Sequence, residues 1–150
     1  MVMYLDSAII VKLLVREHDS AWFEKNLTGQ RFETSELALS EVCGALLFKE
    51  RKNEIIPAER VRAMEKFLSM VEEEAIVLRQ LDRKVIERAR SIQVACHPRI
   101  PLRTLDALHV ATCDLHQQTM SATDGRIRSA CGQLGIALVP EKIEQLPQPK

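Results

Sequence analysis

The chain has no long hydrophobic run, few aromatic residues and no excess of either charge. No stretch approaches the roughly 20 apolar residues that a membrane span needs, and the segment before Asp6 lacks the basic region of a signal peptide. We therefore expect a cytoplasmic protein with no membrane contact. One tryptophan and one tyrosine leave little for a platform on which nucleic-acid bases could stack.

Cysteine pairs are also lacking. The four cysteines, at positions 43, 96, 113 and 131, are widely separated, and apolar helical patterns surround two of them, which predicts reduced, structural thiols. The 21 basic and 21 acidic side chains balance, so the overall charge neither favours nor excludes a nucleic-acid partner. A polyanion would have to be held by local basic patches or by a metal ion.

Strand and helix patterns alternate along the chain, which predicts an α/β domain with a parallel sheet and helices on both faces. The 46% hydrophobic content over 150 residues is enough for one sizeable core. Strands are expected near residues 2–6, 32–35, 75–79, 119–123 and 136–139. Helices are expected near 7–16, 19–28, 36–52, 57–73, 82–94, 104–117 and 126–134. We expect a single domain over 1–140 and a tail over 141–150 that is frayed from residue 145.

The spacing of apolar residues predicts which helix faces turn toward the core. On the helix expected over 36–52, this face comprises Leu39, Val42, Cys43, Leu46 and Leu47. On the helix expected over 104–117, it comprises Leu105, Leu108, Ala111 and Leu115.

Four acidic residues occupy positions where a small α/β domain would ordinarily avoid charge. Asp6 lies between an apolar strand and an apolar helix start, and Asp124 follows a later strand in the same way. Both fall at the carboxyl ends of predicted parallel strands, where open α/β sheets bind ligands. Glu41 is the only charged residue between positions 37 and 48, and Asp106 lies in the first turn of its helix.

Each aspartate, taken alone, has an ordinary structural explanation. Asp6 and Asp124 fit helix N-cap positions, and Asp106 fits a first turn, where the helix dipole favours an anion. Glu41 has no such explanation, because it is expected mid-helix among apolar neighbours. The case for a functional site is therefore a joint one, resting on two strand-end acids and two helix acids in one small domain.

Converging carboxylates would repel one another, which raises some of their pKa values, and a hard cation would relieve the repulsion. Mg²⁺ or Mn²⁺ fits best, because both prefer oxygen ligands. Such a cation lowers the pKa of a bound water and stabilises charge developing on a phosphodiester, so phosphodiester hydrolysis is the expected reaction. Ser7 and Thr123 adjoin the strand-end acids and either orient them by hydrogen bonds or serve ordinary turns.

A zinc site is an alternative on the helix expected over 104–117. His109, Cys113 and His116 share one face of this helix and could in principle hold Zn²⁺. Neither a second ligand cluster nor a Cys-x-x-Cys motif accompanies them. Otherwise, we expect His109 to pack beside Asp106.

Basic residues near the four acids are candidates for phosphate contacts, although most such residues are ordinary solvated surface. The candidates are Lys12, Arg16, Lys49, Arg51, Lys52, Arg99, Arg103, Arg126 and Arg128. Arg103 and Arg126 stand out, because each lies within a few residues of a candidate metal-binding acid. Recognition of a nucleic acid would then depend on its backbone charge and shape.

Four short motifs in a fixed order resemble the PIN-domain ribonucleases of the VapC toxin type. They are Tyr-Leu-Asp-Ser-Ala at 4–8, Ser-Glu-Val at 40–42, Leu-Arg-Thr-Leu-Asp-Ala-Leu-His at 102–109 and Thr-Asp-Gly-Arg-Ile at 123–127. The resemblance extends from Val2 to about Val139, and the Asp-Ala-Leu-His segment is the most specific part. One departure is Ala122, which stands where that family usually has Ser or Thr.

The resemblance implies a three-layer α/β/α fold and a metal-dependent endoribonuclease. In that family, the acids that match Asp6, Glu41, Asp106 and Asp124 hold one or two Mg²⁺ or Mn²⁺ ions. It also implies a homodimer and a cognate antitoxin with an extended arm that covers the active groove. Apolar residues that could serve these contacts, or pack in the core, are Ile55, Ile56, Phe67, Leu68 and Met70.

Two other functions remain open at this point. A PIN-like domain could bind RNA or a protein without cleaving it. A phospho-acceptor or phosphatase domain could use Asp6 as its nucleophile, but it would need a second acid nearby and a lysine at a later strand end, and the sequence supplies neither clearly.

Overall fold

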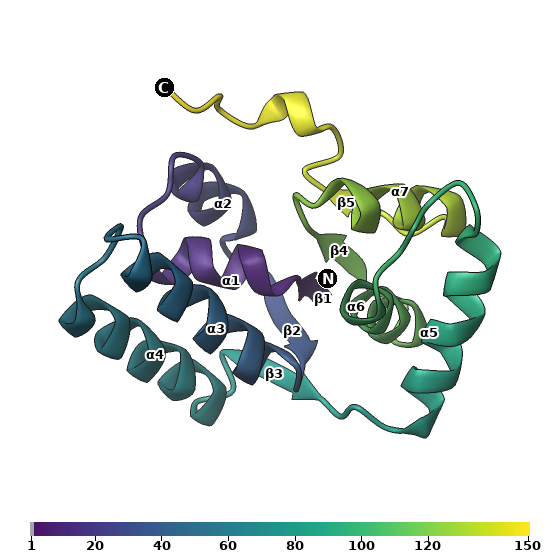
Figure 1. Cartoon of the computed structure of the whole chain (residues 1–150), viewed down its shortest axis with the longest axis horizontal. Helices are drawn as coiled ribbons and strands as arrows, with labels where there is room; N and C mark the ends of the chain where they lie inside the picture. Colours follow the sequence, from purple (N-terminus) through teal and green to yellow (C-terminus); the bar gives the residue numbers. More distant parts are fainter. Residues whose placement is uncertain (1) are drawn as a thin grey trace.

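The computed structural model describes residues 2–150 and has a five-stranded, fully parallel sheet in the order β3-β2-β1-β4-β5 (Figure 1). The strands are β1 (Val2–Leu5), β2 (Arg31–Ser35), β3 (Ile76–Arg79), β4 (Thr119–Ser121) and β5 (Leu138–Val139). The helices are α1 (Ser7–Leu14), α2 (Ser20–Leu27), α3 (Ala38–Arg51), α4 (Pro57–Glu72), α5 (Arg83–Cys96), α6 (Thr104–Leu115) and α7 (Gly125–Leu134), followed by a short 3₁₀ turn, η1 (Ile143–Gln145). Every strand and helix predicted from the sequence is present.

Side chains of the central strand β1 point alternately into two hydrophobic cores. Met3 and Leu5 pack in the core under α1–α4, whereas Tyr4 packs in the core under α5–α7. Figure 1 shows the two helix groups on opposite faces of the sheet. The fold is therefore the predicted three-layer α/β/α arrangement, and no helix within residues 2–150 has the length and apolar character needed to cross a membrane.

Local sequence features set several helix boundaries. The Asp82 carboxylate accepts a hydrogen bond from the Val85 amide at 3.1 Å and so caps α5. Pro57 is the first residue of α4, and Gly135 ends α7 in the left-handed conformation at φ 73°. The four cysteines are free, and Cys96, Cys113 and Cys131 are buried in the core beneath α5–α7.

The predicted core face of α3 is partly wrong. Ala38, Val42 and Leu46 are fully buried, whereas Leu39 is 36% exposed. The buried residues follow a strict four-residue spacing, because α3 contacts both α1 and α4 along a narrow line. Leu39 lies to one side of this line.

The predicted core face of α6 is also wrong at both ends. Leu105 and Leu115 are 48% and 43% exposed, while Ala107, Val110 and Ala111 are fully buried. Small residues occupy the buried face because α6 packs closely against α5 and also contacts α7, β2 and β4.

The apolar residues proposed as contact surface divide between core and surface. Phe67 and Ile55 are buried and Met70 is partly buried, whereas Ile56 and Leu68 are 58% and 46% exposed. The tail is not wholly frayed, since Leu146 is buried against the core under α1–α4.

A buried acid on β2 is held by an arginine on the neighbouring strand. Arg79 on β3 donates two hydrogen bonds to the Glu33 carboxylate, at 2.6 and 2.8 Å, and the Gln118 amide donates a third. Burial alone would raise the pKa of Glu33, but the hydrogen bonds and charge of Arg79 hold it below its ordinary value. The pair therefore contributes stability above the unfolded-state pKa of Glu33, and this contribution is lost as the pH falls through its lower folded-state pKa.

Arg79→Met should destabilise the protein by about 2 kcal/mol at pH 7, because a buried carboxylate loses its charged partner. The loss of stability should be smaller near pH 4, where Glu33 of the variant takes up a proton. Urea denaturation at both pH values measures the effect. Arg83→Met is the control, because its ion pair with Glu87 is exposed and contributes little. Equal losses of stability in the two variants would show that the buried ion pair contributes no more to stability than the exposed one.

Candidate active site

The site lies at the carboxyl edge of the sheet, where the chain order reverses between β1 and β4. This reversal leaves a crevice beyond the strand ends, which is the usual ligand position in parallel sheets. The Asp6 amide donates to the Ser121 carbonyl at 3.1 Å, and the Thr34 hydroxyl donates to the Leu5 carbonyl at 2.7 Å. These bonds fix the end of β1 to both neighbouring strands just where Asp6 begins.

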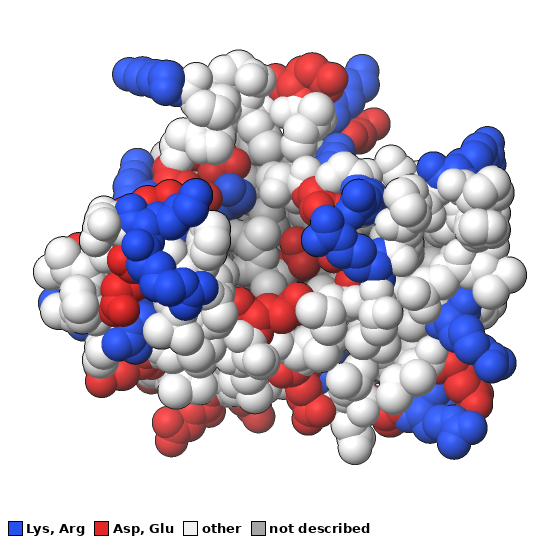
Figure 2. Space-filling view, in the orientation of Figure 1, with Lys and Arg blue, Asp and Glu red and all other residues white. Residues whose placement is uncertain are grey.

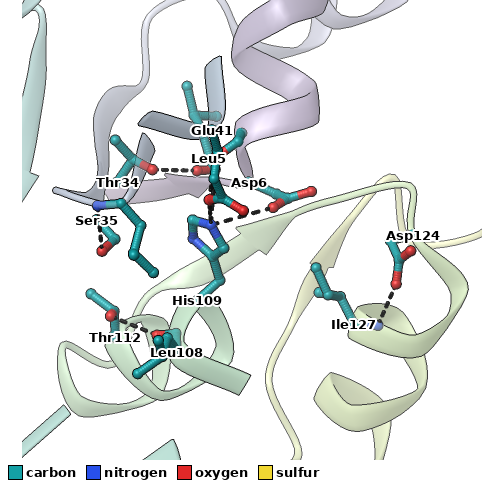
Figure 3. A network of polar contacts seen from close by, with 12 residues as sticks. Leu5, Asp6, Thr34, Ser35, Glu41, Leu108, His109, Thr112, Asp124 and Ile127 are labelled. Carbon is teal, nitrogen blue, oxygen red and sulfur yellow. Dashed lines mark hydrogen bonds and ion pairs between the residues drawn. The ribbon is translucent and has the colours of Figure 1, made fainter. Parts of the chain in front are cut away.

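Asp6 occupies the N-cap position of α1, but its side chain makes no capping hydrogen bond. The residue is only 7% exposed, and one carboxylate oxygen lies 3.9 Å from Nε2 of His109. The ordinary explanation of Asp6 as a helix cap is therefore wrong. Its carboxylate points into the crevice instead (Figure 3).

Glu41 reaches the same crevice from the first turn of α3. Its Oε1 atom accepts a hydrogen bond from the Ser7 hydroxyl at 2.9 Å and lies in close contact with Nε2 of His109. Burial alone would raise the pKa of Glu41, but the hydrogen bond and charge of His109, together with Ser7, hold it below its ordinary value. Ser7 thus orients Glu41, rather than the strand-end acid beside it.

Asp106 and Asp124 lie on the β4 side of the crevice. Asp106 is half-buried in the first turn of α6, and Asp124 is exposed at the start of α7. The Oδ1 atom of Asp124 accepts hydrogen bonds from the amides of Arg126 and Ile127, both at 3.0 Å, so Asp124 is a true N-cap. Figure 3 shows Asp124 set apart from the contacts that join Asp6 and Glu41 to His109.

The electrostatic effects of the acids on one another show which of them converge. Burial is the first cause of the raised pKa of Asp6, which is about 6; His109 lowers it, and the charges of Glu41 and Asp106 raise it. Burial also raises the pKa of Asp106, and the charge of Asp124 adds to this rise. Asp6, Glu41 and Asp106 therefore form a repelling cluster, and Asp124 joins it through Asp106.

His109 is buried beside the acids, as a core or supporting histidine would be, but the sequence did not predict its partners. It is almost fully buried, and its ring lies between Glu41, Asp6 and Tyr4 rather than simply beside Asp106. Burial would lower the pKa of His109, but the hydrogen bond to Glu41 and the surrounding carboxylate charges raise it. The sequence signal was the three-residue spacing from Asp106, which puts both side chains on one helix face.

The zinc alternative on α6 is not formed. The Cys113 thiol donates to the Gln118 carbonyl at 3.3 Å, and His116 is exposed, while His109 faces Glu41. Across residues 2–150, no three His, Cys, Asp or Glu side chains form a group that could hold a metal ion as they stand. The phospho-acceptor alternative gains no support either, because β2, β3, β4 and β5 end at Ser35, Arg79, Ser121 and Val139 rather than at a lysine.

The donor set of the crevice suits a hard divalent cation. It offers carboxylate oxygens, and the raised pKa values of Asp6 and Asp106 indicate that negative charge is crowded there. Glu41 keeps Oε2 free of the contacts that Oε1 makes, and Asp124 keeps Oδ2 free of its capping bonds. These oxygens remain available to a cation.

Basic side chains border the crevice on its β4 side. Arg99, Arg103 and Arg126 line a hollow of about 530 Å³ together with Asp124. Figure 2 shows acidic atoms in the central hollow of the molecule and basic atoms on both sides of it. Two of the other candidates already have partners within the protein. Lys12 forms ion pairs with Glu17 and Asp19, and Arg128 donates to two backbone carbonyls.

Comparison with known proteins agrees with this geometry. The chain is 32% identical over 140 residues to Ribonuclease VapC46 of Mycobacterium tuberculosis, covering 91% of this chain and 95% of that protein. The fold is similar to that of VapBC2 from Rickettsia felis, solved bound to a promoter DNA fragment, with a TM-score of 0.66 and 12% identity over 92% of this chain and 97% of that one.

A second solved structure with this fold is the Mycobacterium tuberculosis toxin VapC20, which cleaves the sarcin-ricin loop. Its TM-score is 0.63 at 16% identity, over 85% of this chain and 94% of that one. The sequence profile of the PIN domain matches residues 3–133. This match covers most of the chain and includes all four candidate acids, so the chain belongs to the PIN domain family.

Proposed function

We propose that this protein is a metal-dependent endoribonuclease and the toxin of a toxin–antitoxin pair. The main observation behind the proposal is the environment of Asp6. Its buried carboxylate lies where the strand order reverses between β1 and β4, makes no capping hydrogen bond, and is close to the charges of Glu41 and Asp106. Such a cluster costs stability without a cation, which points to a functional reason for it. Similarity to Ribonuclease VapC46 supports RNA as the substrate.

Asp6, Glu41 and Asp106 would hold Mg²⁺ or Mn²⁺, and Asp124 would assist through its free oxygen or through water. When bound, the cation would lower the pKa of a water and stabilise negative charge on the phosphodiester. Arg103 and Arg126 would bind phosphates of the RNA backbone beside the cluster.

Partners are part of the proposal. The antitoxin would be a separate chain whose extended arm covers the crevice, and the toxin would form a homodimer in the cytoplasm. Solved structures with the same fold include toxin–antitoxin complexes, which supports the antitoxin. Exposed apolar side chains such as Ile56 and Leu68 offer surface for these contacts.

A non-catalytic RNA- or protein-binding module is the second candidate. The observation that favours it is the capping role of Asp124, which occupies one oxygen of the fourth acid with the α7 amides. The following variants separate the two functions.

Asp6→Asn and Asp106→Asn should each reduce metal-dependent RNA cleavage by about 100-fold or more, because each removes charge where the cation would bind. The assay incubates purified protein with total RNA in Mg²⁺ or Mn²⁺, with EDTA as the metal-free arm. Glu87→Gln on the exposed face of α5 is the control and should cleave normally. Antitoxin-free wild-type protein that yields no metal-dependent fragments would favour the binding module.

Asp6→Asn should also make the protein more stable at neutral pH in the absence of metal. The folded-state pKa of Asp6, about 6, is above its unfolded value, so its ionised form destabilises the fold. This cost is absent below about pH 4 and reaches about 3 kcal/mol above pH 6. In urea denaturation from pH 4 to pH 8, the free energy of unfolding of the variant should increase relative to that of the wild type as the pH rises. A variant that is less stable at every pH would make Asp6 a structural residue.

Asp124→Asn tests the charge of the fourth acid without removing the cap. Asn and Asp cap helices about equally well, so stability should change by less than about 0.5 kcal/mol, whereas Asp124→Ala should lose about 1 kcal/mol. We expect Asp124→Asn to cleave RNA about 10-fold more slowly, with the fold intact by circular dichroism. Unchanged cleavage would limit Asp124 to its structural role.

A further inference from the structure

Tyr4 and His109 form a buried chain of contacts that ends on Glu41. The Tyr4 hydroxyl lies 2.6 Å from Nδ1 of His109, and Nε2 of the same ring contacts Oε1 of Glu41. The two rings meet edge to face, at 70° and 5.8 Å between centroids. Tyr4 is fully buried and His109 is 1% exposed, so water does not compete for the bond between them.

The available hydrogens determine which atom donates to Glu41. The hydroxyls of Thr34 and Thr112, which flank the phenol, donate to the carbonyls of Leu5 and Leu108. If His109 is neutral, the acceptor-only Glu41 carboxylate favours the ring proton on Nε2, and the Tyr4 hydroxyl then donates to Nδ1. If His109 is charged, both nitrogens carry protons, and the phenol accepts from Nδ1 and donates to a threonine oxygen. In both states Nε2–H donates to Glu41.

The neutral form with its proton on Nδ1 is disfavoured by Glu41. That form would turn the lone pair of Nε2 toward the Glu41 carboxylate, and the two would repel each other. The carboxylate thus keeps a proton on Nε2, and the Tyr4 hydroxyl, 2.6 Å from Nδ1, fixes the orientation of the imidazole.

Glu41 receives both of its donors on the same atom. Ser7, at the start of α1, and His109, on α6, both act on Oε1, which fixes the rotation of the carboxylate. Oε2 is then left for a different ligand. Asp6 does not receive a hydrogen bond from His109, because Nε2 lies 3.9 Å from its carboxylate, beyond hydrogen-bond distance.

We propose that Tyr4 and His109 are positioning residues, which hold Oε1 of Glu41 through Nε2–H so that Oε2 faces the cation. This inference rests on the proposed function, since it assigns a role in preparing the same site. Polar groups that orient a metal-binding carboxylate typically contribute 10–100-fold to metal affinity. A purely structural role would instead affect folding stability without changing cation affinity.

The test measures Mn²⁺ binding by titration calorimetry together with RNA cleavage over a range of Mn²⁺ concentrations. Tyr4→Phe and His109→Leu should weaken Mn²⁺ binding 10–100-fold and raise the Mn²⁺ concentration for half-maximal cleavage equally. The KM for RNA at saturating Mn²⁺ should be unchanged. His109→Gln should retain affinity better than His109→Leu, because its side-chain amide can still donate to Glu41.

Ser121→Ala is the matched control. It also removes a buried hydroxyl close to the site, but that hydroxyl donates to the Val139 carbonyl and not to the network. Its Mn²⁺ affinity should equal that of the wild type. Near-ultraviolet circular dichroism checks folding, and should His109→Leu fail to fold, Tyr4→Phe and His109→Gln decide the question.

Nitrogen-15 NMR of the histidine rings gives a second, metal-free measurement. His109 should carry a proton on Nε2 in the wild type, and Tyr4→Phe should shift the Nδ1 resonance, because that nitrogen loses its hydrogen-bond partner. A wild-type ring protonated only on Nδ1 would overturn the proposal.

The outcomes separate this inference from the function on which it rests. If the wild type binds Mn²⁺ and cleaves RNA while Tyr4→Phe and the folded His109 variants match it, only the positioning role is wrong. If the wild type neither binds Mn²⁺ nor cleaves RNA, the proposed nuclease function is wrong, and the cation-positioning role is wrong as well.

Discussion

Carboxylates crowd together at the end of β1, and the contacts around them must hold that strand end in place. Asp6 is buried, makes no capping bond and lies close enough to Glu41 and Asp106 for their charges to raise its pKa. Repulsion of this kind would pull the strand end apart unless other contacts held it. The bonds from Asp6 to Ser121 and from Thr34 to Leu5 supply that hold from the two neighbouring strands.

The cluster can exist only when both helical layers are packed on the sheet. Glu41 and Ser7 come from the layer of α1–α4, whereas Asp106 and His109 come from α6 on the opposite face. His109 connects the two layers by bonding to Glu41, and it places a buried basic group among the carboxylates. The two hydrophobic cores therefore contribute to the site indirectly, by fixing the distance between α3 and α6 across the end of β1.

The sequence predicted the elements because they depend on local patterns, and local patterns also made the four acids candidates. Strand runs, helix spacing and the caps at Asp82 and Gly135 are all visible within about ten residues. The partners of His109 were not predictable in this way, since Tyr4 and Glu41 are 105 and 68 residues from it. The exposure of Leu105 was missed for a related reason, because the core-facing side of α6 is set by close packing against α5.

Asp124 shows why a structural and a functional explanation need not exclude each other. Its Oδ1 atom carries both capping bonds to α7, which leaves Oδ2 and the full negative charge at the rim of the crevice. The capping bonds fix the carboxylate without burying it, so the fourth acid avoids the desolvation that Asp6 experiences. The difference in burial between Asp6 and Asp124 therefore separates an inner acid, held by the fold, from an outer one that is exposed to solvent in the hollow lined by Arg103 and Arg126.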